Sequence, residues 1–289
     1  MAITAAQVKE LREMTGLGMM ECKQALVEAN GDQDAAVEIL RKKAGAKVDK
    51  KASRIAADGA IAITISANGK TGAIAEVNSE TDFVAKGDDF LAFAADVTKS
   101  VVDGNPKDVD ALMTANGSAL SKQREALVSK LGENMNVRRF ERYETDGVIG
   151  QYLHGRKIGV MVELTGASDE LARDIAMHIA ASKPQYVSAD QVPADVVAKE
   201  KEILSEQAKQ EGKPAEIVEK MVVGRVNKFL NEICLMGQPF VKDPDTTVEK
   251  LLKGAGASVK RFVRFEVGEG MEKRDEDFAA EVMATVKGS

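Results

Sequence analysis

Aromatic side chains are scarce in this chain of 289 residues, and tryptophan is absent. Phenylalanine, tyrosine and tryptophan together make up only 4% of the residues, so we expect no stacking surface for single-stranded nucleic acid. The formal net charge is −6 and the pI is about 5.3, so the molecule as a whole does not attract polyanions. The composition therefore predicts no direct nucleic-acid partner.

Cysteine is also rare, since Cys22 and Cys234 are the only two. Two cysteines this far apart form neither a disulfide framework nor a paired metal-ligand spacing. No apolar stretch approaches the roughly 18 residues that a membrane span needs. Residues 1–4 lack the basic region and following apolar run of a signal peptide. These absences predict a cytoplasmic protein with reduced thiols and no membrane partner.

The residues that usually carry catalysis are missing or isolated. His154 and His178 are the only histidines, and neither lies near a cysteine or completes a readable Ser/His/Asp arrangement. Gly69-Lys70-Thr71 resembles the end of a phosphate-binding loop, but Thr64 stands where that pattern requires glycine. Four carboxylates lie within residues 80–89, but their spacing is not that of an EF-hand. We therefore expect no catalytic residue, no metal site and no cofactor.

The chain does contain an internal repeat. Residues 58–61 (DGAI) resemble residues 146–149 (DGVI), at an offset of 88, and two β-rich runs follow each copy. In the first copy Asn68-Gly69 joins the runs, which predicts a hairpin with a type I′ turn. Helical segments follow at 90–97 and 171–178, at the smaller offset of 81. The first copy therefore carries about seven additional residues between its hairpin and its helix.

Those additional residues are the region from Thr81 to Gly87. They begin with Thr81, Asp82, Phe83 and Val84, and a segment that the other copy lacks has little to do for the shared architecture. An aromatic side chain next to a carboxylate in such a segment is typical of a partner contact. We therefore predict that this insertion is exposed and carries function.

Helices and one further strand flank the repeats. Thr4 and Gln7 form a candidate capping box at the first of three short helices over residues 4–44. Residues 41–54 are rich in lysine and arginine, which fits either a solvated linker or a basic strip for RNA or an acidic protein. A helix is expected at 120–131, and residues 259–267 alternate as a strand beside the second hairpin.

Residues 193–235 read as a helical hairpin with a charged outer face, either a stalk or an arm for docking or dimerisation. A short helix is expected at 277–283. The predicted fold class is α+β. We expect a three-helix bundle with a basic linker (1–54), two repeated hairpin-and-helix core subdomains (55–143 and 144–275), a protruding antiparallel coiled-coil hairpin (about 193–235) and a C-terminal helical module (276–289).

Several segments, spread along the chain and in the same order, resemble the family of bacterial translation elongation factor Ts. They are residues 11–22 (LREMTGLGMMEC), 78–86 (NSETDFVAK), 178–184 (HIAASKP), 237–241 (GQPFV) and 264–270 (RFEVGEG). The resemblance implies a factor, without catalytic chemistry of its own, that promotes GDP release from elongation factor Tu. The competing hypotheses are an adaptor that binds through the N-terminal bundle and an enzyme with a site between the repeats.

The same resemblance implies roles for individual parts. It implies that the bundle is of the ubiquitin-associated type, and that the segment Thr81, Asp82, Phe83 and Val84 displaces magnesium from the partner. It implies that the helical hairpin serves dimerisation in some members of the family. Further contacts with elongation factor Tu are implied for Leu11, Arg12, Met19, Met20, His178 and Phe278.

Overall fold

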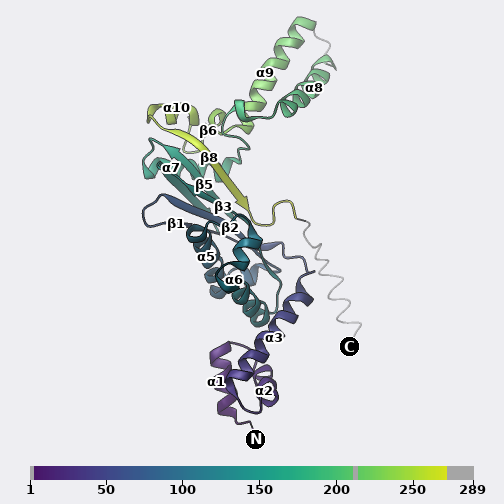
Figure 1. Ribbon diagram of the computed structural model, residues 1–289. Coiled ribbons are helices and arrows are strands. Elements are labelled where there is room, and N and C mark those ends of the chain that lie inside the picture. The colour runs from purple at the N-terminus through teal and green to yellow at the C-terminus, as the bar shows by residue number, and fades with distance from the viewer. Residues whose placement is uncertain (1–2, 211–213, 272–289) are drawn as a thin grey trace. The chain divides into compact units, whose positions relative to one another are not determined.

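The computed structural model of the protein describes residues 3–210 and 214–271 (Figure 1). Helices and strands are both abundant, which confirms the α+β class. Residues 3–62, 75–140 and 266–271 belong to one compact unit, and residues 63–74 with 141–265 form a second. The division at residues 54, 143 and 275 stays a prediction. None of the helices within the described residues is both long and apolar enough to cross a membrane.

The three N-terminal helices form a small bundle with its own core. They are α1 (Ala5–Thr15), α2 (Met19–Glu28) and α3 (Gln33–Lys51). The predicted capping box is confirmed, because Thr4 Oγ1 accepts from the Gln7 amide and the Gln7 side chain accepts from the Thr4 amide. The third helix is longer than expected, because α3 continues to residue 51 through most of the basic segment 41–54, whose role as a linker stays a prediction. The buried residues of the bundle are Val8, Leu11, Leu17, Cys22, Ala25, Leu26, Ala36 and Leu40.

The first repeat is a three-stranded sheet with helices. Its strands are β1 (Asp58–Ile65), β2 (Thr71–Ser79) and β3 (Met135–Glu144), in the order β1-β2-β3. Between β2 and β3 the chain forms α4 (Asp82–Ala85), α5 (Asp88–Gly104) and α6 (Val109–Leu131), and α6 is interrupted at residues 115–118. The hairpin is confirmed but its type I′ turn is wrong, because Gly69 has positive φ and Asn68 does not.

The second repeat has the same plan. Its strands are β4 (Val148–His154), β5 (Ile158–Thr165) and β8 (Ser258–Glu266), in the order β4-β5-β8, so the strand predicted at 259–267 lies beside the second hairpin as expected. α7 (Asp169–Ser182) covers one face. A Cβ on Gly150 would lie 2.3 Å from the carbonyl oxygen of Ala172, so only glycine lets α7 approach β4 this closely.

The third strands of the two repeats match, although β3 was not predicted. Residues 137–144 (VRRFERYE) in β3 correspond to residues 259–266 (VKRFVRFE) in β8. In each sheet the second strand carries a buried glutamate, Glu76 or Glu163, that binds two cations of the third strand. Burial acts to raise the pKa of Glu163, but hydrogen bonds with Thr145, Arg261 and Lys260 outweigh it and hold that pKa below its ordinary value.

The remaining elements follow α7. The helices α8 (Ala194–Gln210) and α9 (Ala215–Ile233) lie side by side as a hairpin (Figure 1). The other elements are two short 3₁₀ turns (Ala189–Gln191 and Leu235–Gly237), β6 (Pro239–Phe240), β7 (Asp243–Thr247) and α10 (Val248–Gly254). The helix expected at 277–283, with Phe278, lies outside the described residues.

Candidate partner-binding site

The inserted segment folds into α4, a single helical turn that presents one aromatic side chain. Thr81 is its N-cap, with its hydroxyl oxygen accepting from the Val84 amide at 3.4 Å. Val84 and Ala85 are buried at 8% and 4% exposure, whereas Phe83 is 85% exposed. The first repeat has the longer connection, as predicted, but residues 80–87 between β2 and α5 exceed residues 166–168 between β5 and α7 by five, not by about seven. The expected exposure of Phe83 is confirmed, but the insertion is not exposed throughout, because Val84 faces the core and is a correction to the predicted contact segment.

The backbone just before α4 is tied to the connection between α6 and β3. The Thr81 amide donates to Glu133 Oε2 at 3.0 Å, and the Thr81 hydroxyl donates to Glu133 Oε1 at 2.6 Å. In the opposite direction, the Asn134 amide donates to Glu80 Oε1 at 2.6 Å. Sequence reasoning missed Glu133, because it lies 52 residues from Thr81 along the chain.

Asp82, beside Phe83, forms an exposed ion pair. Lys86 Nζ lies 2.6 Å from Asp82 Oδ2, at i,i+4 spacing. The hydrogen bond and the negative charge of Asp82 hold the pKa of Lys86 above its ordinary value. Since both side chains are mostly exposed, water screens the pair. The pair gives the turn a polar edge next to its apolar tip.

The N-terminal bundle presents a second apolar surface. Met19 and Met20 are 58% and 68% exposed, and Arg12 is also exposed. Leu11 is a correction, because it has no exposed surface and lies in the core of the bundle, where its side chain cannot touch a partner. Met14, on α1, is also exposed, at 57%, and was not singled out, although it lies inside the segment 11–22.

His178 is a second correction to the predicted contacts, because it is fully buried and packs against Phe240. Its Nδ1 accepts from the Val241 amide at 3.2 Å, so its Nε2 carries the proton and donates to Gln238 Oε1 at 2.9 Å. Burial lowers the pKa of His178, and the bond to Gln238 opposes that shift. His178 therefore holds the loop in place, while Val241, on that loop, is 43% exposed.

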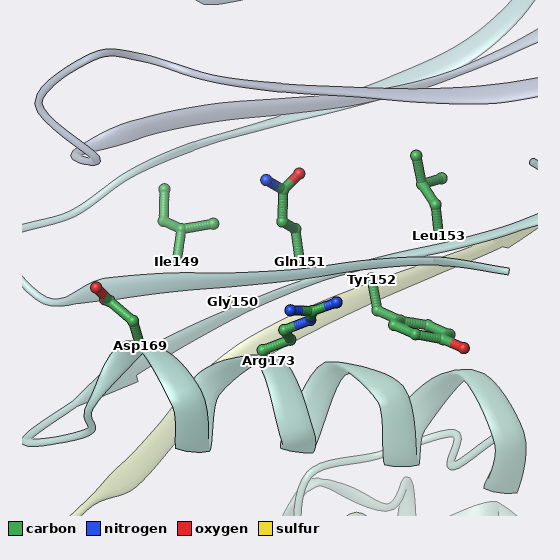
Figure 2. A pocket seen from close by; sticks show the side chains of 7 residues that line it. All are labelled: Ile149, Gly150, Gln151, Tyr152, Leu153, Asp169 and Arg173. Atoms are coloured by element: carbon green, nitrogen blue, oxygen red, sulfur yellow. The ribbon is translucent and has the colours of Figure 1, made fainter.

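A hollow of about 490 Å³ lies where β4 meets α7 (Figure 2). Ile149, Gln151 and Leu153 project from one face of β4, while Tyr152 lies on the other face, toward α7, which carries Asp169 and Arg173 (Figure 2). Its lining contains no serine, cysteine or histidine. The hollow therefore offers no pair of nucleophile and base of the usual kind, and since it lies within the second repeat it does not test an enzyme site between the repeats.

Comparison with known proteins decides the family. The family model described as Elongation factor TS matches residues 80–269. The elongation factor Ts of Alkalilimnicola ehrlichii is 61% identical over 100% of both chains, and those of Thioalkalivibrio sulfidiphilus and Methylococcus capsulatus are 58% and 59% identical over the same shares. The chain belongs to the elongation factor Ts family.

Membership of the elongation factor Ts family gives the protein its broad role in translation elongation. The matched range includes the whole α4 turn, the connection that holds it and the loop around His178. It begins at Glu80, so the exposed methionines of the bundle lie outside the family model, though within the full-length relatives.

The buried His178 predicts a loss of stability in acid. Its pKa is lowered on folding, so the unfolded chain, with an ordinary pKa near 6.5, binds the proton first as the pH falls. Stability is therefore greatest above about pH 6.5 and declines as the pH falls through the lower folded value. Urea denaturation of wild type and His178→Gln between pH 7.5 and 5 measures this dependence.

The free energy of unfolding of His178→Gln should depend less steeply on pH than that of wild type, because glutamine does not titrate. His154 is the exposed last residue of β4, so His154→Gln is the matched control, a histidine substitution outside the core. An unchanged slope in His178→Gln would show that His178 does not carry the effect.

Proposed function

We propose that this protein is a guanine-nucleotide exchange factor for elongation factor Tu. It binds the GDP complex, displaces Mg²⁺ and promotes GDP release, so that GTP can bind during elongation in the cytoplasm. The observation that supports this proposal most directly is Phe83, held at 85% exposure on a rigidly anchored turn. It acts without catalytic chemistry, cofactor or direct nucleic-acid contact of its own.

The mechanism follows from the charges around bound GDP. Mg²⁺ bound beside the phosphates of GDP would neutralise part of their negative charge and so strengthen GDP binding. Phe83 enters the partner beside the metal site, and Asp82 binds a polar or cationic group there. Moving the ligands of Mg²⁺ by about an ångström weakens GDP binding, since such small misplacements have large effects. By reciprocity, GDP weakens the binding of the factor equally.

Other surfaces hold the turn in register. In this proposal Met19, Met20 and Arg12 of the bundle dock on the nucleotide domain of elongation factor Tu, with Phe278 as a further contact. The loop carrying Val241 reaches a more distal domain, positioned by His178 from within. Exposed Ile203, Ile217 and Val223 on the helical hairpin supply an apolar surface for a homodimer.

The test is release of a fluorescent GDP analogue from purified elongation factor Tu, chased with excess GDP. With micromolar factor and millimolar Mg²⁺ we expect faster release, and a coupling of about 4 kcal/mol would lower the affinity for GDP by about a thousandfold. In excess chelator the partner has already lost its Mg²⁺, so the acceleration should shrink sharply. An unchanged release rate at millimolar Mg²⁺ would sink the proposal, and equal acceleration without Mg²⁺ would contradict displacement of the metal.

A further inference from the structure

The turn that carries Phe83 is too short to hold its own shape. α4 has only four residues, and isolated helices shorter than about 12 residues are marginal in water. The capping bond from the Val84 amide to Thr81 is long, at 3.4 Å. Phe83 itself, at 85% exposure, has almost no contacts that could fix it. Something outside the turn must therefore set its position.

That external support is a reciprocal pair of carboxylates. Glu133 accepts hydrogen bonds from both the amide and the hydroxyl of Thr81, and Glu80 accepts one from the amide of Asn134. Each of the two chain segments therefore hydrogen-bonds to the backbone of the other. The acceptors are side-chain carboxyl oxygens, and two of the three bonds are as short as 2.6 Å. We call these four residues, Glu80, Thr81, Glu133 and Asn134, the clasp.

The clasp is itself anchored to rigid structure. Asn134 is 2% exposed, and its side-chain amide donates to the Arg54 carbonyl at 2.8 Å. Met135, the first residue of β3, is fully buried. Gly132 ends α6 in the left-handed region at φ 81°, which turns the chain so that Glu133 follows at once. Glu133 thus extends from the junction of a helix and a strand, not from a loop free to move.

We propose that Glu133 is a positioning residue for nucleotide exchange: it holds the Thr81 end of the turn so that Phe83 meets the partner in one orientation. This inference rests on the proposed function. Without Glu133 the turn keeps Val84 and Ala85 as its inner anchors but loses the two bonds that fix its N-terminal end. Phe83 then samples several orientations, and few of them reach the metal site.

The test compares Glu133→Ala and Glu133→Gln with wild type. We expect Glu133→Ala to lower the maximal GDP-release rate at saturating factor by about tenfold, since a misplacement of 1 Å can lower a rate by up to about a hundredfold. The half-saturating concentration should change little, because docking uses other surfaces. Glu133→Gln keeps one acceptor for the two donors of Thr81 and should lie between.

Two controls separate positioning from loss of fold. Asp108 Oδ1 caps α6 by accepting from the Ala111 amide at 2.7 Å, so Asp108→Ala removes a comparable bond far along the chain from α4 and should leave the rate unchanged. In the double variant Glu133→Ala/Phe83→Ala, the release rate should equal that of Phe83→Ala alone, because Glu133 acts only through Phe83. A further tenfold loss in the double variant would overturn the proposal.

Hydrogen exchange of the free factor keeps this inference distinct from the proposed function. In Glu133→Ala the amides of Thr81, Val84 and Ala85 should exchange faster, while those of α5 should not change. If they exchange as in wild type, Glu133 does not hold the turn and the inference fails, whatever the release assay shows. If wild type does not accelerate GDP release, the proposed function fails and takes the positioning role with it, even where faster exchange shows that the clasp exists.

Discussion

Replacing Phe83 with alanine should lower the maximal GDP-release rate by about a hundredfold and leave the free energy of unfolding within about 0.5 kcal/mol of wild type. The first effect follows because burying the Phe83 side chain in the partner would stabilise the complex that releases GDP by about 1.5–3 kcal/mol. A hundredfold change in rate corresponds to about 2.7 kcal/mol. The second follows because Phe83 is 85% exposed, so the fold gains little from it.

The experiment measures release at saturating factor beside urea denaturation of each variant. Phe83→Leu keeps an apolar side chain of smaller shape and should lose less activity than alanine. Leu153, which is 39% exposed at the end of β4, gives the control Leu153→Ala, which should exchange as wild type does. A large fall in stability for Phe83→Ala, or a wild-type rate, would mean that Phe83 is not the element that acts on the partner.

The exposure of Phe83 could be predicted because it follows from a difference in spacing. When the two repeats are compared, the change in sequence offset between hairpin and helix shows which repeat has additional residues. Those residues are not needed for the fold that the repeats share. The support of that segment could not be predicted, because Glu133 meets Thr81 only when β3 takes its place in the sheet. Hydrogen bonds between a side chain and a distant backbone produce no periodic pattern in the sequence from which they could be predicted.

β3 was missed for a related reason. The adjacent Arg138 and Arg139 break the apolar–polar alternation expected of a half-buried strand. Both form ion pairs with buried Glu76, a contact that a hydropathy pattern cannot reveal. The match between residues 137–144 and 259–266 was the available signal. Leu11 and His178 were predicted as partner contacts but are buried. A segment shared by a family includes buried residues that support a binding surface as well as the exposed residues that touch the partner.

Glu76→Ala should cause a large loss of stability. Glu76 is fully buried and accepts from Arg138 Nη1 at 3.0 Å, Arg139 Nε at 2.7 Å, the Gly268 amide at 2.8 Å and the Asn78 side chain at 3.1 Å. Removing it leaves these donors without their shared acceptor. Breaking a buried pair in this way costs about 3–5 kcal/mol, and the partial exposure of both arginines favours the lower end.

Urea denaturation followed by circular dichroism measures this loss. Glu144 makes a single bond to Arg142 at 2.8 Å with its own side chain 70% exposed, so Glu144→Ala is the matched control and should lose less than about 1 kcal/mol. Glu163→Ala removes the corresponding carboxylate of the second repeat, with partners at 3.0 Å and 2.6 Å, and should behave like Glu76→Ala. A Glu76→Ala midpoint no lower than that of Glu144→Ala would show that the buried glutamates do not hold the third strands.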